Sequence, residues 1–132
     1  MPASPPMRYT RTMTQIAQYF AGNEPALPSR WAAEVEALLS AGERTQAWVE
    51  TDLDAQLHFA AGLVIVTDKR LVARAPGVAQ WSDWPLRAGL RLNHADHAGV
   101  GMLELVDEHG RLACWRYTLG NNLAALRVIT EF

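Results

Sequence analysis

Several features are scarce in this sequence, and each absence excludes a class of protein. The single cysteine, Cys114, excludes an internal disulfide and suits a reducing compartment. No stretch approaches the roughly 20 apolar residues of a membrane-spanning helix, and the N-terminus lacks the apolar core of a signal peptide. With 12 basic and 14 acidic residues the net charge is −2, whereas nucleic-acid binders are usually strongly basic. We therefore expect a soluble protein that binds no nucleic acid.

The motifs of common enzyme classes are also missing. The sequence has neither a G-x-S-x-G nucleophile elbow nor a G-x-x-x-x-G-K-[ST] phosphate loop. Gly99-Val-Gly101 lacks the third glycine of a dinucleotide-binding loop. Cys114 lies in a strand-like run without an adjacent base, so a buried or half-buried side chain is favoured over a nucleophile. We predict no catalytic residue and no cofactor.

What the sequence does contain is apolar periodicity, beginning with two helical patterns. After a proline-containing lead-in, apolar residues recur at helical spacing between 12 and 22. A second pattern begins at Ser29, the predicted N-cap, and ends at 40–42. Its apolar stripe consists of Trp31, Val35, Leu38 and Leu39. We divide the chain into a tail with a short amphipathic helix, 1–28, and a folded domain, 29–132.

After Gly42 the apolar period changes to two, which predicts antiparallel strands. The clearest hairpin joins 63–67 to 71–75 through the polar turn Asp68-Lys69-Arg70, and its first strand is apolar enough to bury both faces. A second hairpin joins 102–106 to 111–119. Further short strands are predicted at 47–53, 57–59, 78–84 and 90–94.

A last amphipathic helix follows, capped by Asn121 or Asn122. Together these patterns predict an α+β domain, in which about seven antiparallel strands form a barrel or strongly bent sheet closed by the C-terminal helix. The predicted core consists of Leu63, Ile65, Leu71, Leu103, Leu105, Trp115, Tyr117, Leu123, Leu126 and Ile129. The sequence ends at Phe132 without a glycine stop or polar tail, so we expect it to belong to a longer protein.

His94, Asp96 and His97 form the densest group of metal-ligand residue types, and His58 or His109 could supply a fourth ligand. Their spacing matches no standard zinc pattern, and we expect His94 and His97 to lie in a strand end and a turn. We expect no metal, and these three residues are the weakest of the candidate sites.

Surface residues of two kinds are candidates for a contact surface. In Trp81-Ser-Asp-Trp84-Pro, strand alternation places the two tryptophans on opposite faces, and either one left exposed would mark a contact. Core and rim packing is the favoured role for the five tryptophans. Lys69 and Arg70 form a basic turn, which is more typical of a solvated hairpin tip than of a binding site.

The stretch Gly62-Leu-Val-Ile-Val-Thr-Asp-Lys-Arg-Leu71 resembles a recurring hairpin of bacterial PH-like and GRAM-like domains. In that hairpin a glycine and an apolar strand precede Thr-Asp/Asn-x-Arg-Leu, which Thr67, Asp68, Arg70 and Leu71 match. Over roughly residues 30–132 the chain is also similar to the N-terminal extension of a group of bacterial ABC exporters. The similar segments are Gly42-Glu-Arg, Trp48 to Asp54, Phe59, Trp81 to Pro85 and Leu112 to Asn121.

This resemblance implies a PH-like fold and a non-catalytic regulatory or docking role in an ATP-driven exporter, at the cytoplasmic face of the inner membrane. The implied partner is the remainder of the transporter or another protein; the ATPase motifs are absent from this chain. Eukaryotic PH domains bind phosphoinositides through basic residues near their first hairpin, where this chain has Glu50, Asp52 and Asp54. Direct lipid contact is therefore left open. The alternative is a stand-alone PH-like module that binds a small ligand or a protein.

Overall fold

The computed structural model describes residues 27–132, so the helix predicted at 12–22 lies outside the described residues. The elements are α2 (Ser29–Leu38), β1 (Thr45–Glu50), β2 (Leu63–Thr67), β3 (Arg70–Arg74), β4 (Ser82–Pro85), β5 (Arg91–His97), β6 (Val100–Asp107), β7 (Gly110–Thr118), a short 3-10 turn (Leu119–Asn121) and α3 (Asn122–Glu131). None of the helices in this part of the chain is long and apolar enough to cross a membrane.

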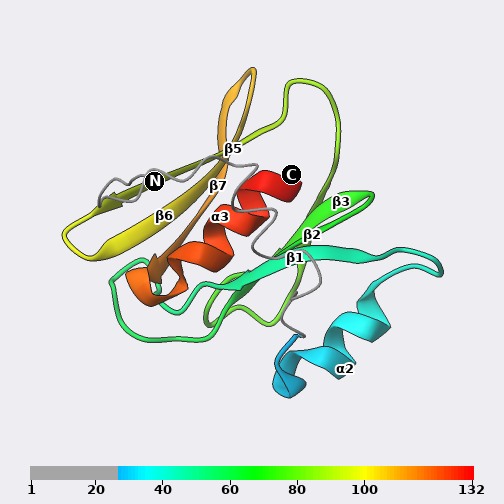
Figure 1. The fold of residues 1–132 in the computed structure, drawn as a ribbon, viewed down its shortest axis with the longest axis horizontal. Coiled ribbons are helices and arrows are strands. Elements are labelled where there is room, and N and C mark those ends of the chain that lie inside the picture. The colour runs from blue at the N-terminus through cyan, green and yellow to red at the C-terminus, as the bar shows by residue number, and fades with distance from the viewer. Residues whose placement is uncertain (1–26) are drawn as a thin grey trace, which may run out of the picture.

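The domain is α+β, and its strands form two antiparallel sheets, as Figure 1 shows. One sheet has the order β1-β2-β3-β4 and the other the order β5-β6-β7. The predicted barrel is wrong in this respect, because within residues 27–132 the strands do not close into one. Residues 86–90 separate β4 from β5 and contain Gly89 at φ 90°, a turn conformation that favours glycine. An isolated bridge between Leu53 and Arg116 joins the segment after β1 to β7 of the three-stranded sheet.

Strand β2 is buried along its whole length, as its β-branched sequence predicts. Leu63 and Ile65 pack against Trp31 and Val35 of α2, on the outer face of the four-stranded sheet. Val64 and Val66, on the opposite face of β2, belong to the main core between the two sheets and α3. A sheet covered on both faces has no room for polar side chains at its centre, so the polar groups of this region gather at strand ends.

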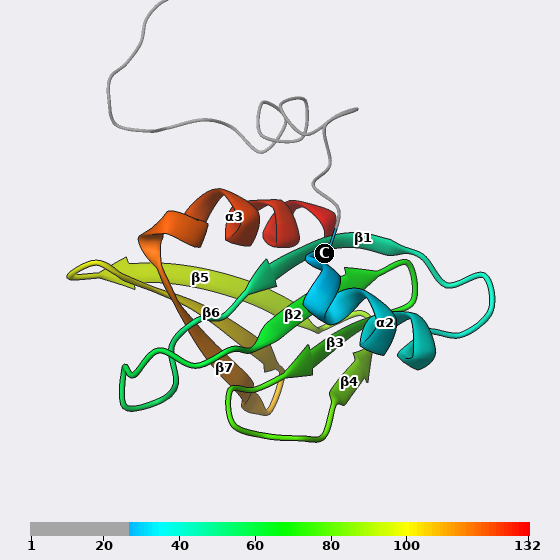
Figure 2. The ribbon, with the colours of Figure 1, turned by 90° about the horizontal axis from the view of Figure 1, so that it is seen from below.

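Helix α3 lies beside β1 and β5, across one side of the two sheets (Figure 2). Its buried apolar residues are Ala125 and Val128, whereas the predicted core residue Leu123 is 47% exposed. The prediction that Leu123 faces the core is wrong. The helix is apolar on most of its circumference, so residue spacing alone does not show which face is buried. Leu126 and Ile129 are half-buried, and the other seven predicted core residues are buried.

The starts of α2 and β4 are among the boundaries that differ from prediction. Pro28, rather than Ser29, occupies the N-cap of α2, and the cap has no side-chain hydrogen bond. The predicted strand 78–84 is reduced to β4, because the preceding turn continues: Val78 N–H donates to the Ala75 carbonyl at 3.1 Å, and the Val78 carbonyl accepts from Arg74 Nε at 2.8 Å. The hairpins β2–β3 and β6–β7 are confirmed.

Candidate functional site

The polar turn between β2 and β3 is built around a buried carboxylate, that of Glu43. The Glu43 side chain is 1% exposed and pairs with Arg70 in a two-pronged geometry, Nε to Oε2 at 2.9 Å and Nη2 to Oε1 at 3.1 Å. Thr67 Oγ1 donates to the same carboxylate at 2.6 Å and accepts from the backbone N–H groups of Lys69 and Arg70. Each of these groups is satisfied by the others.

This network also joins separate elements. Arg70 Nη2 donates to the Leu38 carbonyl at the end of α2 at 3.1 Å, and Nη1 contacts Asp83 of β4 at 3.0 Å. Arg70 therefore ties α2, the 40–44 turn and β4 to the hairpin. Its hydrogen bond holds the pKa of Glu43 at about 2, against the opposing effect of burial, and the pKa of Arg70 is raised in turn.

Of the two basic candidates at this turn, Arg70 is thus engaged in the fold, while Lys69 is exposed to solvent. Asp68 closes the other side of the turn, since its Oδ1 accepts from Arg44 N–H at 2.9 Å. The matched Thr-Asp-x-Arg residues therefore have structural partners, which explains in physical terms why those residue types are needed at that spacing.

The two tryptophans of the candidate contact surface lie on opposite faces of the sheet, and both are half-buried. Trp81 packs edge-to-face on Trp31 with ring centroids 6.1 Å apart, beside α2. Trp84 packs on Trp115 at 5.8 Å, against the main core. Both rings thus contribute to packing, with only their outer parts left for contact.

His94, Asp96 and His97 lie along the edge strand β5, each exposed to solvent. Alternation along a strand sends His94 and Asp96 to one side and His97 to the other. Among residues 27–132 the structure brings no three histidine, cysteine, aspartate or glutamate side chains close enough to hold a metal ion.

Two further reactive side chains lie within β7. The Tyr117 hydroxyl is buried without a hydrogen-bond partner among the described residues, and burial, with Asp96, raises its pKa to about 12. Its phenol therefore stays protonated at neutral pH. Cys114 is half-buried, as predicted. Neither residue lines the pocket described next.

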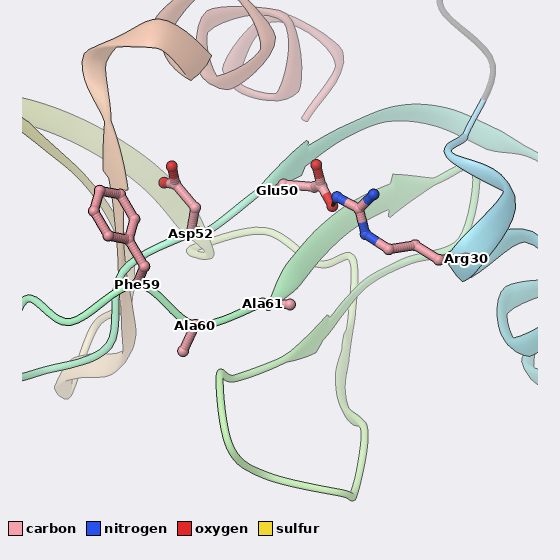
Figure 3. A pocket seen from close by; sticks show the side chains of 6 residues that line it. All are labelled: Arg30, Glu50, Asp52, Phe59, Ala60 and Ala61. Carbon is pink, nitrogen blue, oxygen red and sulfur yellow. Dashed lines mark hydrogen bonds and ion pairs between the residues drawn. The ribbon is translucent and has the colours of Figure 1, made fainter.

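A pocket of about 330 Å³ lies between the start of α2 and the segment that joins β1 to β2 (Figure 3). Its lining residues are Arg30, Glu50, Asp52, Phe59, Ala60 and Ala61. Figure 3 shows Arg30 and Phe59 at the two ends of this row, with the carboxylates of Glu50 and Asp52 between them. The pocket is open to solvent, and its volume is at the lower limit for ligand sites.

The Phe59 wall of the pocket is held by a compact loop, where a strand was predicted at 57–59. Asp54 Oδ1 accepts from the backbone N–H groups of Gln56 and His58, both at 2.9 Å. This capture forces Leu57 to φ 66°, a left-handed conformation that costs a leucine about 1 kcal/mol. The loop shows why the strand prediction was wrong: an aspartate side chain competes for N–H groups that a strand would present to its neighbour.

This loop presents large apolar side chains to solvent. Phe59 is 80% exposed and Leu57 is 51% exposed, although the loop backbone is fixed by a bridge between Leu53 and Phe59. Sequence reasoning missed both as site residues because their alternation with His58 imitates a half-buried strand. The usable signal was Asp54 itself, since an aspartate side chain often accepts from the backbone N–H two residues later and stabilises a turn.

The carboxylates of the pocket differ in their partners. Asp52 accepts from Thr118 N–H at 2.8 Å and from Thr118 Oγ1 at 2.7 Å, which fixes the loop to the end of β7. Glu50 accepts from Trp31 Nε1 at 2.8 Å and is paired with Arg30, whose side chain is 62% exposed. With two carboxylates and one guanidinium, the lining has a net charge of −1.

No family model, curated protein or solved structure matches the chain.

Proposed function

We propose that this chain is a PH-like, non-catalytic docking or regulatory domain of a bacterial ABC-type ATP-driven exporter, at the cytoplasmic face of the inner membrane. The observation that carries the proposal is the arrangement of the fold: antiparallel strands flanked by a C-terminal helix that packs against β1 and β5. The resemblance of residues 30–132 implies antiparallel strands followed by a C-terminal helix, and this element order supports the proposal, although the strands form two sheets instead of a closed barrel.

The polar contacts of the hairpin support the same proposal. Thr67, Asp68 and Arg70, which match the recurring motif, all bond to groups within the domain. Because the side chains of this motif bond within the domain, the motif indicates a type of fold and does not indicate a catalytic activity. The function then depends on other parts of the surface, where the pocket beside Phe59 offers an exposed aromatic ring.

The alternative is a stand-alone module that binds a small ligand or a protein, and the pocket of about 330 Å³ is the observation in its favour. Its open form and its mixture of apolar and charged lining residues fit a side chain of another protein better than an enclosed small molecule, since ligand sites usually bury most of their ligand. A protein partner is therefore common to both candidates.

The DNA on either side of the coding segment distinguishes the two candidates. The exporter assignment predicts apolar runs of about 20 residues and a phosphate-binding loop, in the same reading frame or in an adjacent gene. Deleting residues 29–132 from that exporter should change transport or its regulation while leaving ATP hydrolysis by the remaining protein. If neither membrane spans nor a phosphate loop is encoded nearby, the stand-alone module is favoured instead.

A further inference from the structure

The pocket beside Phe59 combines an exposed aromatic face with an excess of negative charge. Phe59 is 80% exposed in a loop whose backbone is pinned by Asp54 and by the bridge to Leu53, so the ring is presented without a buried role of its own. The carboxylates of Glu50 and Asp52 lie between Arg30 and Phe59 (Figure 3), and Glu50 is paired with Arg30. Asp54, with its side chain 27% exposed, adds further negative charge to this loop.

From this combination we infer that the pocket binds an arginine or lysine side chain of a partner protein, flanked in that partner by an apolar residue. The cationic head would approach Glu50 and Asp52, while its alkyl stem or guanidinium plane would cover the ring of Phe59. Leu57, which is 51% exposed on the same loop, offers the partner's apolar residue a contact.

The acceptor capacity of the pocket is sufficient for such a cation. An ionised carboxylate offers about four lone-pair sites, and Asp52 uses two of them on Thr118. Glu50 is paired with Arg30, whose exposed guanidinium occupies the position that an incoming cation would take. Arg30 is therefore an internal competitor, which a partner's arginine displaces.

The chemical class of the partner follows from the proposed function, on which this step rests. Cytoplasmic segments next to membrane spans carry an excess of lysine and arginine. Such a segment of the exporter supplies both the cation and the adjacent apolar residues. An anionic membrane surface is the less suitable occupant, since Glu50, Asp52 and Asp54 would repel it.

The test uses the 132-residue chain and a fluorescent, end-capped peptide of alternating leucine and arginine, with fluorescence anisotropy as the readout. A peptide with glutamate in place of arginine is the charge control. The inference predicts binding of the arginine peptide alone, weakened when salt rises from about 0.1 M to about 1 M and the Debye length falls from about 10 Å to about 3 Å. Equal binding of both peptides, or of neither, would overturn it.

Variants locate the interaction. Phe59→Ala and Glu50→Gln should each weaken binding by about fivefold, through loss of the cation–π contact and of the charge respectively. Their matched controls are Val78→Ala, another exposed apolar side chain, and Glu36→Gln, an exposed carboxylate of α2, which should leave the affinity unchanged. Circular dichroism confirms that each variant is folded.

Arg30→Ala gives the sharpest outcome, because removing the competitor should strengthen binding by about threefold. A purely structural role for the Arg30–Glu50 pair would instead weaken binding, and that result overturns the inference. So would binding of anionic phosphatidylglycerol vesicles that Phe59→Ala removes, since the surface would then be a lipid contact. Peptide binding is measured without the exporter, so its failure and the failure of the exporter assignment are independent results.

Discussion

Two turns of this domain use their side chains in opposite ways. The turn between β2 and β3 carries charged and polar residues, yet Glu43, Thr67 and Arg70 are directed inward and bonded to one another. The loop between β1 and β2 carries the apolar residues Leu57 and Phe59, and these point to solvent. The polarity of a side chain therefore does not show whether it stabilises the fold or is available for binding. The groups that it contacts show this.

The difference teaches how to interpret a recurring motif in a small domain. From its sequence the charged turn is more typical of a solvated hairpin tip, but each of its charged side chains that closes the turn has an internal partner. An aromatic residue in an alternating stretch appears to be core, but a local aspartate reshapes its loop and leaves the ring outside. The following predictions test the contrast, beginning with the largest effect.

Arg70→Ala should reduce the free energy of unfolding by about 3 kcal/mol or more, because it leaves the Glu43 carboxylate buried without its cation. Arg30→Ala is the matched control: it also removes an arginine from a glutamate pair, but that arginine is 62% exposed, so a loss within about 1 kcal/mol is expected. Urea unfolding measures both. Equal losses would remove the distinction between the two regions.

Acid should weaken the buried network specifically. The folded-state pKa of Glu43 is about 2 against an ordinary 4.5, so the unfolded chain binds more protons between these values and stability falls as the pH drops through this window. In Glu43→Gln the free energy of unfolding should depend less on pH between 5 and 2. The pKa of Asp107, lowered mainly by the backbone N–H of His109, leaves some slope in both proteins. Identical slopes would contradict the assignment.

Leu57→Gly should raise the free energy of unfolding by about 0.5 kcal/mol, because glycine accepts the φ of 66° without the strain that leucine has there. The control is Leu112→Gly, which alters another exposed leucine, within β7, and should instead lower stability by about 1 kcal/mol. Thermal unfolding compares the two. A destabilising effect at both positions would show that Leu57 contributes packing in this loop.

Phe59→Ala should change the free energy of unfolding by less than about 0.5 kcal/mol, since the ring is 80% exposed. Trp84→Ala, which removes a ring packed on Trp115, provides the contrast with a clearly larger loss. A large loss at Phe59 would mean that the ring supports the fold and is unavailable for contact.

Much of the fold could be predicted from the sequence, because strand and turn signals are local. The run from Leu63 to Thr67 is β-branched enough to specify a strand buried on both faces, and the turn after it closes within two residues. The division of the strands into two sheets could not be predicted, since it depends on whether β4 pairs with β5. Nor could the inward face of α3, where Leu123 and Val128 are equally apolar in sequence.

The candidate site was harder to predict than the fold. Trp81, Trp84 and Arg70 are conspicuous residues, but each gains its partners from segments distant in sequence, which periodicity does not reveal. The pocket depends on the approach of Arg30 to Glu50, also distant in sequence, and on the loop conformation that Asp54 imposes.

The central claim, that the hairpin turn is structural and the β1–β2 loop is the contact surface, is tested most directly by mapping a titration residue by residue. The ¹⁵N-labelled chain is titrated with the unlabelled leucine–arginine peptide, and backbone amide shifts are followed by NMR. The account predicts shifts at Arg30 and within residues 50–61, with residues 67–70 unchanged. Shifts centred on Lys69 and its neighbours, with residues 50–61 unchanged, would contradict it.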